Sequence, residues 1–319
     1  MCVEIIITEK EQIVLQNLAN SLKNISPTKH IDLFLSLAKN ASRGLPKRIQ
    51  TILFEFNEKN KGSLLIKNLP VTDCPSTPEN NKYHVGETTT LGILQAIFNQ
   101  FLGEMVSYEA EGDGHLFQDM VPNRLLQTTQ TSLGSKIELE LHTEQAFSEV
   151  RPDYLSLACL NGDENAKTFI LHLQDIIDHL STEDVELLKK ERWKIGVDMS
   201  FVMNGCKNDL RGPFSILNNN NGNWELIFDQ DLMVGETTNA SELIEKITNI
   251  YYDYREYVIL KKGDLLILNN HKLVHGRSSF EPKFDGNDRF IIRSFILKNL
   301  KKIYGKTGNH NRMVAKEYS

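Results

Sequence analysis

The feature that most constrains this chain is a series of short, apolar, β-type runs that fills most of the sequence after residue 134. Turn-forming residues and two longer helical patterns separate these runs, which are KIELELH, DYLSLACL, KTFILHL, FSIL, WELIF, LLIL and RFIIRSFIL. Many short strands joined by turns favour a sandwich or a jelly roll over a doubly wound parallel sheet. We therefore expect a mainly β fold with added helices.

Apolar residues at helical spacing mark the first part of the chain. Leu15, Leu18 and Leu22 share a helical face, and HIDLFLSLAKNASR and KRIQTILFEFNEKN predict two further helices. STEDVELLKKERW and SELIEKITNIYYDYRE predict helical insertions among the strands. No linker or repeat divides the chain, so we expect a single domain over residues 1–319. Its expected parts are a helical N-terminal layer (1–60), a β core with insertions (61–300) and a C-terminal tail (301–319).

The composition excludes several classes of partner. The 319 residues are 40% hydrophobic and 24% charged, with a net charge of −6 and scattered lysines and arginines, which argues against nucleic acid. No apolar run approaches a membrane span, and MCVEIIITEKEQ lacks the basic lead-in and cleavage site of a signal peptide. The four cysteines are far apart, without a CxxC pair, and indicate reduced thiols in a cytoplasmic protein. A homo-oligomer is compatible with these patterns.

The stretch IELELHTEQAF (137–147) reads as a strand that carries a possible metal site. Side chains alternate along a strand, so His142 and Glu144 would share a face, and His275 in NNHKLVHGRSSF is the best third ligand. Two histidines and a carboxylate form a facial triad suited to Fe(II), although zinc could use the same residues. An HxE pair alone is weak, since chance matches are common. Glu138 and Glu140 are expected on a solvated part of the same face.

A pair of arginines strengthens the metal interpretation. In NDRFIIRSF, Arg289, Ile291 and Arg293 would point to the same side of a strand. Two arginines directed into a sandwich are costly without anionic partners, and a dicarboxylic co-substrate would supply one. A solvated strand face is the plainer alternative.

Together these segments resemble a known family. LELHTEQAFSEVRPDYLSLACL and LILNNHKLVHGRSSFEPKFDGNDRFIIRSFI are similar to the clavaminate synthase-like Fe(II)/2-oxoglutarate oxygenases, especially the bacterial hydroxylases of free arginine, asparagine and lysine. The resemblance implies a double-stranded β-helix (jelly roll), a bound Fe(II), and 2-oxoglutarate and O₂ as co-substrates. It implies the following roles: iron ligands His142, Glu144 and His275; 2-oxoglutarate-binding residues Arg289 and Thr168; and substrate-binding residues Arg293 for the α-carboxylate, Gln118 for the α-amino group, and Glu144.

The resemblance also implies the reaction and suggests a substrate. The presence of Glu144 favours hydroxylation, with 2-oxoglutarate converted to succinate and CO₂. The D-x-D of IFDQDLMVGET, Asp229 and Asp231, matches a loop that contacts a guanidinium in arginine hydroxylases and favours a basic side chain. We expect hydroxylation of free L-lysine at C3 or C4. Open alternatives are L-arginine, another free or carrier-bound amino acid, a small acid, and a non-catalytic jelly-roll binding protein. His271 is expected to be a loop residue and not a ligand.

Overall fold

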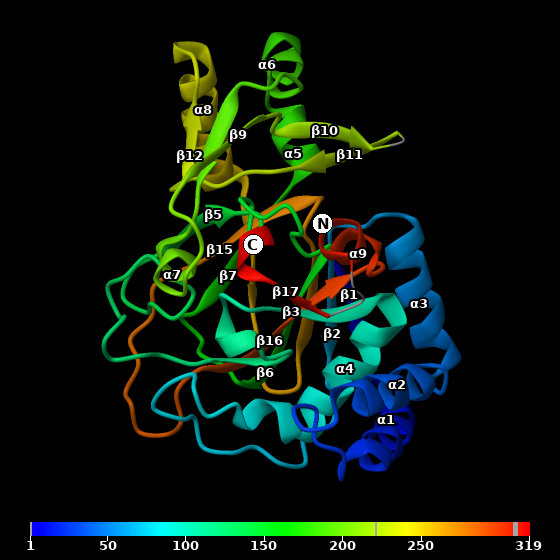
Figure 1. Cartoon of the computed structure of the whole chain (residues 1–319). Coiled ribbons are helices and arrows are strands. Elements are labelled where there is room, and N and C mark those ends of the chain that lie inside the picture. Colours follow the sequence, from blue (N-terminus) through cyan, green and yellow to red (C-terminus); the bar gives the residue numbers. More distant parts are fainter. Residues whose placement is uncertain (1, 221, 309–311) are drawn as a thin grey trace.

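The structure is a computed structural model that describes residues 2–220, 222–308 and 312–319. Two sheets face each other at its centre (Figure 1). The larger sheet runs, in hydrogen-bonded order, β1 (Val3–Ile6), β2 (Ser63–Lys67), β14 (Leu265–Asn269), β6 (Tyr154–Asn161), β16 (Phe290–Leu297), β3 (Glu104–Tyr108) and β17 (Met313–Val314), with β4 (Gln118–Met120) also paired to β16. The smaller sheet runs β13 (Glu256–Ile259), β7 (Lys167–His172), β15 (Leu273–Arg277) and β5 (Leu139–His142).

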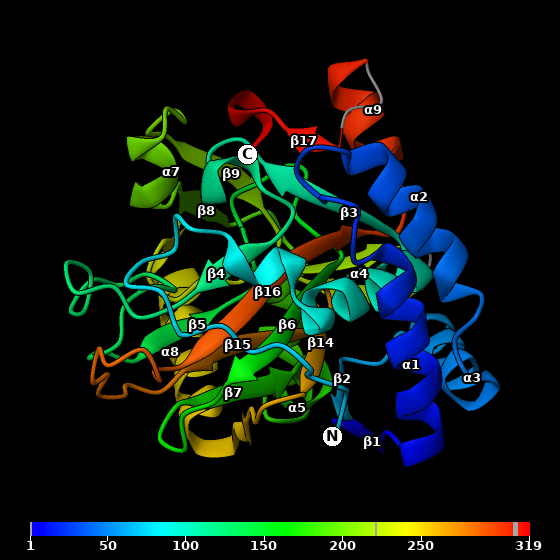
Figure 2. The same ribbon diagram turned by 90° about the horizontal axis from the view of Figure 1, so that it is seen from below.

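Helices cover the outer face of the larger sheet (Figures 1 and 2). They are α1 (Glu9–Leu22), α2 (Ile31–Ser42), α3 (Lys47–Glu58) and α4 (Thr90–Leu102). Alternation along β16 sends Ile292 and Ile296 into this helical layer. Gln95 of α4 donates from Nε2 to the carbonyl oxygen of Ile292 at 3.0 Å, so polar contacts also fix the helix to the sheet.

The opposite faces of the two sheets enclose the inner core. Ile291 and Phe295 of β16 pack there with Ile170 of β7 and Leu273 of β15. Arg293 of β16 also faces inward and lines a cavity between the sheets. The expectation of a shared face is therefore confirmed for Ile291 and Arg293, the two residues within β16. Arg289 lies one residue before β16 and lines the same cavity.

An insertion covers the outer face of the smaller sheet, and most of its elements lie in the upper part of Figure 1. Its elements are α5 (Leu173–Asp178), α6 (Thr182–Leu188), β8 (Trp193–Gly196), α7 (Met199–Met203), β9 (Leu210–Phe214), β10 (Leu217–Asn220), β11 (Asn223–Leu226), β12 (Met233–Gly235) and α8 (Thr238–Tyr254). Trp193 is fully buried there, and its indole N–H donates to the carbonyl oxygen of Ala240 at 3.1 Å.

The remaining elements are α9 (Lys301–Thr307) and the short helices η1 (Val85–Thr88), η2 (Gly112–Gly114) and η3 (Lys316–Tyr318). Among the helices in the described parts of the chain, none has the length and apolar character that a membrane span requires. The chain is thus a mixed helix and strand fold, in which strands build the centre and helices form the outer layers.

Candidate metal centre and substrate pocket

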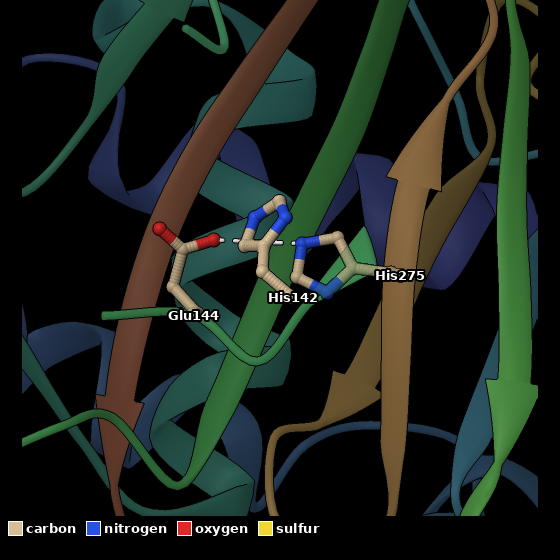
Figure 3. Close-up of side chains that lie close together, drawn as sticks. All are labelled: His142, Glu144 and His275. Carbon is tan, nitrogen blue, oxygen red and sulfur yellow. Dashed lines mark ion pairs between the residues drawn. The ribbon is translucent and has the colours of Figure 1, made fainter. Parts of the chain in front are cut away.

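Two histidines and a carboxylate from separate parts of the chain come together between the sheets (Figure 3). His142 ends β5, His275 lies in β15, and the two residues are direct partners in the antiparallel pairing of these strands. Glu144 belongs to the turn after β5, because the strand ends at His142. The three side chains meet as the sequence predicts, but the expected alternation along one strand is wrong for Glu144, which approaches from the turn.

The geometry of the three side chains suits a metal ion. Their ligand-type atoms all lie within 4.8 Å of one another, and Nε2 of His275 lies 3.6 Å from Oε2 of Glu144. Nδ1 of His142 lies 2.8 Å from the carbonyl oxygen of Glu140, which assigns the hydrogen to Nδ1 and leaves a lone pair on Nε2. Burial, followed by the nearby His142, lowers the pKa of His275 and keeps its imidazole neutral. Neutral imidazoles and a carboxylate form the donor set of a facial triad.

Residues beside the ligands fix the turn that carries Glu144. The backbone N–H of Glu144 donates to Oδ1 of Asn270 at 2.6 Å, and Nδ2 of Asn270 donates to the carbonyl oxygen of Glu144 at 2.9 Å. The intervening Thr143 is fully buried, and its N–H donates to the carbonyl oxygen of Phe228 at 2.8 Å. The central residue of HTE therefore anchors the turn to the insertion, while its neighbours face the site.

Glu144 is ionised despite its burial. Burial raises the pKa of this carboxyl group, but Arg293, then His275 and His142, outweigh it and lower the pKa to about 2. Nη1 of Arg293 lies 3.4 Å from Oε1 of Glu144. The carboxylate is thus available as a ligand at neutral pH.

Arg293 is held by two further residues. Its Nε donates to Oε1 of Gln118, its cross-strand partner on β4, at 3.0 Å, and its Nη2 donates to Oε1 of Glu111. Oε2 of Glu111 accepts a hydrogen bond from Gln145 at 2.8 Å. Gly112 has a φ of +58°, and a Cβ at this position would lie 2.6 Å from Gln118, so glycine allows the Glu111 loop to pack closely. Sequence reasoning missed Glu111, which lies in a turn without a strand pattern.

Two cavities meet at the triad, since His142, Glu144 and Arg293 line both. We call the first the acidic pocket. The empty space within it is about 660 Å³, which includes open solvent at its mouth. Its carboxylates are Glu111, Glu140, Glu144, Asp198, Asp229 and Asp231. We call the second the arginine pocket; its polar side chains include Thr168, His275, Arg277 and Arg289.

The D-x-D pair lies in the acidic pocket. Asp229 is buried, and its Oδ1 accepts hydrogen bonds from the N–H groups of Asp231 at 3.0 Å and Leu232 at 2.9 Å. Burial raises the pKa of Asp229 to about 6, although His142 and these N–H groups oppose the rise. Asp231 is exposed. The predicted pair therefore lines one pocket with the metal ligands, with one carboxyl group buried and the other at the surface.

Glu138 and Glu140 differ from the expected solvated pair. Glu140 is half-buried and lines the acidic pocket, where burial and then Asp231 raise its pKa. Glu138 forms an ion pair with Arg255 at 2.5 Å. The expectation was wrong because a helix of the insertion brings Arg255 over this end of the strand, and the insertion closes over Glu140.

The arginine pocket contains the residues predicted for 2-oxoglutarate. Thr168 lies on β7 and is the direct antiparallel partner of Arg277 on β15, while Arg289 approaches from the larger sheet. Burial lowers the pKa of Arg289, and burial together with Arg289 lowers that of Arg277 to about 9. The pattern VHGR contains Arg277, but sequence reasoning gave it no role.

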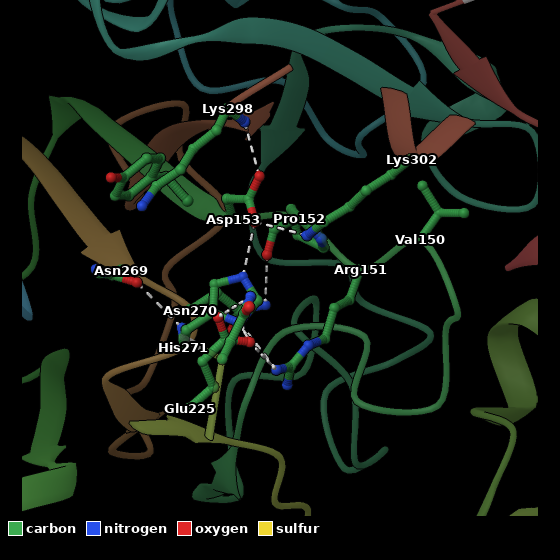
Figure 4. A network of polar contacts seen from close by, with 12 residues as sticks. Val150, Arg151, Pro152, Asp153, Glu225, Asn269, Asn270, His271, Lys298 and Lys302 are labelled. Carbon is green, nitrogen blue, oxygen red and sulfur yellow. Dashed lines mark hydrogen bonds and ion pairs between the residues drawn. The ribbon is translucent and has the colours of Figure 1, made fainter. Parts of the chain in front are cut away.

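His271 lies in the turn before β15, as expected, and takes part in a buried polar network (Figure 4). Arg151 donates from Nη2 to Nδ1 of His271 at 2.8 Å, and Nε2 of His271 donates to Oδ1 of Asp153 at 2.7 Å. Oε2 of Glu225 also lies 3.3 Å from Nδ1, but Nη2 of Arg151 is closer. Nδ1 therefore accepts from the guanidinium and the imidazole is neutral, consistent with the lowering of its pKa to about 4 by burial and then by Arg151. The network joins Arg151 and Asp153, at the C-terminal end of the loop that carries Glu144, to the turn before β15.

Comparisons with known proteins agree with this geometry. The family model for "Taurine catabolism dioxygenase TauD, TfdA family" matches residues 95–294. The chain is 42% identical to an L-lysine 3-hydroxylase of Catenulispora acidiphila over 292 residues, which cover 90% of this chain and 82% of the relative. It is 28% identical to an enduracididine beta-hydroxylase of Streptomyces hygroscopicus, with 81% and 83% covered. A crystal structure of an asparagine oxygenase with Fe(II), 3-hydroxyasparagine and succinate superposes with a TM-score of 0.90 at 24% identity, covering 98% and 99% of the two chains.

Proposed function

Because this chain belongs to the TauD/TfdA family of dioxygenases, we propose that it is an Fe(II)- and 2-oxoglutarate-dependent hydroxylase that acts on C3 of free L-lysine. The acidic pocket carries the proposal for a basic substrate, because its carboxylates surround a space that opens directly onto the triad. The 3-position rests on the similarity to the lysine 3-hydroxylase.

In this proposal His142, Glu144 and His275 bind Fe(II). When bound, the iron with 2-oxoglutarate and O₂ supplies the oxidising chemistry that hydroxylates an unactivated C–H bond and converts 2-oxoglutarate to succinate and CO₂. Three protein ligands leave coordination positions open for the co-substrates. The task of the remaining residues is to orient both organic molecules and to exclude water from the space between the sheets.

The two pockets would divide the two organic molecules. Arg289 and Thr168 are proposed for the distal carboxylate of 2-oxoglutarate in the arginine pocket, where burial strengthens charge pairing. Arg293 is proposed for the α-carboxylate of lysine, because its guanidinium lines both pockets beside Glu144. Gln118 stays the residue proposed for the α-amino group, and its Oε1 accepts a hydrogen bond from Arg293; the neighbouring Glu111 adds a carboxylate for the same α-ammonium group.

The side-chain ammonium group of lysine would pair with Asp229 and Asp231, supported by Glu140. Besides the larger effect of burial, the nearby Asp231 raises the pKa of both Asp229 and Glu140, so a cation among these carboxylates relieves repulsion. L-Arginine is a second candidate on the same observation, because a guanidinium pairs well with carboxylates.

Two further aspects belong to the proposal. The facing sheets are interpreted as the double-stranded β-helix, or jelly roll, within one domain, and helices α1 to α3 as its N-terminal layer. The four cysteines are all free, which supports a protein of the reducing cytoplasm.

A panel of free amino acids tests the proposal. The protein is incubated with Fe(II), 2-oxoglutarate and each amino acid, succinate is quantified, and the product is analysed by mass spectrometry and NMR. We expect L-lysine to gain one oxygen at C3. Turnover of acidic or amide amino acids without lysine or arginine would contradict the basic-substrate proposal, and oxygen at C4 would contradict the position. A His142→Ala variant should lose the visible band that anaerobic Fe(II) and 2-oxoglutarate produce together.

A further inference from the structure

The arginine pocket holds a buried guanidinium to which the described residues offer no hydrogen-bond acceptor. Arg277 is 5% exposed, and none of its three guanidinium nitrogens has a hydrogen-bond partner among them. Other buried arginines in the protein are paired differently: Arg293 contacts Glu111 and Glu144, and Arg151 lies 4.0 Å from a carboxylate oxygen of Glu225. Arg277 therefore differs from these buried arginines, and its unpaired guanidinium group requires a physical explanation.

The position of Arg277 in β15 directs it to the cavity. His275 lies two residues earlier on the same inward face, and Gly276 between them faces the insertion, where a Cβ would lie 2.5 Å from the hydroxyl of Tyr251. Thr168 is the direct antiparallel partner of Arg277. The smaller sheet thus presents a guanidinium and a hydroxyl group side by side to the same space.

The larger sheet adds a second guanidinium opposite them. Arg289 lines this cavity and, like Arg277, lies near the ring of Phe280, with centroid distances of 5.9 Å and 5.0 Å. Of the described residues that line the cavity, Glu144 supplies the only carboxylate, and it is already engaged by Arg293 and His275. Arg277 is buried and Arg289 is half-buried. Two like charges withdrawn from solvent without an anion between them are costly, so the pocket is suited to an anionic ligand.

We propose that Arg277 binds the distal carboxylate of 2-oxoglutarate together with Arg289 and Thr168. This inference rests on the proposed function and assigns a residue to which the sequence patterns gave no role. Two guanidinium groups and a hydroxyl group can donate to both oxygens of one carboxylate. A 2-oxo acid without the distal carboxylate would leave both guanidinium groups unpaired, so the pocket should strongly prefer a 2-oxo dicarboxylic acid.

Calorimetric titration of the Co(II)-loaded protein tests this without turnover. The two ligands are 2-oxoglutarate and 2-oxopentanoate, which has the same chain length but no distal carboxylate. We expect Arg277→Gln to weaken 2-oxoglutarate binding about tenfold to a hundredfold, the usual effect of one charge-assisted hydrogen bond. Binding of 2-oxopentanoate should change by less than about threefold, so the preference for the dicarboxylate falls.

Two control variants separate a binding role from a structural one. Arg277→Lys keeps the charge but loses the planar fork, so it should give an intermediate loss. Arg255→Gln removes a guanidinium that is paired with Glu138 outside both cavities, and should leave the preference unchanged. Metal-free Arg277→Gln should melt at the wild-type temperature or above it, since the variant removes an unpaired buried charge.

The outcomes are distinct for the two proposals. If Arg277→Gln weakens both ligands equally, keeps the wild-type preference, or lowers the melting temperature of the ligand-free protein by many degrees, Arg277 is structural and the inference is overturned. If the wild-type protein binds 2-oxoglutarate no better than 2-oxopentanoate, the proposed function itself fails.

Discussion

The side chain of Asn270 forms hydrogen bonds with both backbone polar groups of Glu144. Oδ1 of Asn270 accepts from the Glu144 N–H at 2.6 Å, and Nδ2 donates to the Glu144 carbonyl oxygen at 2.9 Å. The same Nδ2 donates to the carbonyl oxygen of Pro152 at 2.9 Å, and the side chain is fully buried. One asparagine beside β15 therefore sets the turn that presents a ligand on the other side of the site.

Replacing Asn270 with alanine should weaken metal binding by more than the accompanying loss of folding stability accounts for. The variant frees the Glu144 turn, and loss of a residue that orients a ligand typically costs about tenfold to a hundredfold in metal affinity. Titration with Co(II), followed by absorbance, measures this affinity.

Asn269→Ala is the matched control. Asn269, the last residue of β14, is equally buried, but it donates to the carbonyl oxygen of Lys61 and accepts from the N–H of His271 and contacts no metal ligand. The Asn269→Ala variant should lose folding stability and keep the wild-type affinity for Co(II). Equal affinity losses in the two variants would show that Asn270 has no specific positioning role.

Neutralising the D-x-D pair should reduce selection for a basic side chain. Asp229→Asn retains the oxygen that caps the turn, and Asp231→Asn changes an exposed group, so both should fold. We expect kcat/KM for L-lysine to fall about tenfold to a hundredfold for Asp229→Asn, and less for Asp231→Asn, whose charge is screened by solvent.

L-Norleucine, which lacks the terminal ammonium group, provides the comparison substrate. The ratio of kcat/KM for L-lysine to that for L-norleucine should fall in both variants. Asp209→Asn, which alters an ion pair with Lys207 and Arg211 elsewhere in the insertion, should keep the wild-type ratio. An unchanged ratio in the Asp229 variant would remove this carboxylate from substrate recognition.

Much of the secondary structure follows from local patterns, and the exceptions have physical causes. The helices before residue 60 and the long strand β16 show clear periodicity and are found where expected. β1 was missed because its four residues, three of them apolar, become a strand only through pairing with β2, about sixty residues away. FSIL is not one strand: Phe214 ends β9 and Leu217 begins β10. Pairing partners decide such cases, and a single sequence does not state them.

The site was predictable where its residues form ordered motifs. HTE, VHGR and the paired arginines predicted residues that now line two adjoining pockets. Glu111 and Asn270 carry no such signal, because one lies in an irregular turn and the other acts on a backbone distant in sequence. Their roles depend on three-dimensional contacts that local spacing does not encode.

Glu111→Gln should impair the use of lysine without impairing that of 2-oxoglutarate. Burial raises the pKa of Glu111, and Arg293 opposes the rise, so the variant removes a charge that balances Arg293 in the acidic pocket. We expect about a tenfold or greater loss in kcat/KM for L-lysine, with an unchanged affinity for 2-oxoglutarate by calorimetry. Glu104→Gln, which removes a carboxylate paired with Lys39 and Arg312, should leave both values unchanged. Equal losses for both ligands would contradict a role specific to the substrate.

Acid should destabilise the protein through His271. Its imidazole is neutral when it accepts from Arg151, with a folded pKa of about 4, whereas the unfolded value is about 6.5. Between pH 4 and pH 6.5 the unfolded chain binds a proton at His271 that the folded protein does not bind. The contribution of neutral His271 to the free energy of unfolding is therefore complete above about pH 6.5 and is lost as the pH falls toward 4. Its contribution to the slope is at most about 1.4 kcal/mol per pH unit.

His271→Gln isolates this contribution, because a glutamine side chain can accept from Arg151 and donate to Asp153 without titrating. The free energy of unfolding, measured with urea from pH 4.5 to 8, should fall less steeply toward acid in this variant than in the wild type. His179→Gln, at an exposed helix end, should keep the wild-type slope. Parallel curves for His271→Gln and the wild type would mean that the imidazole has the same pKa in the folded and the unfolded protein, and that the contact with Arg151 does not lower it.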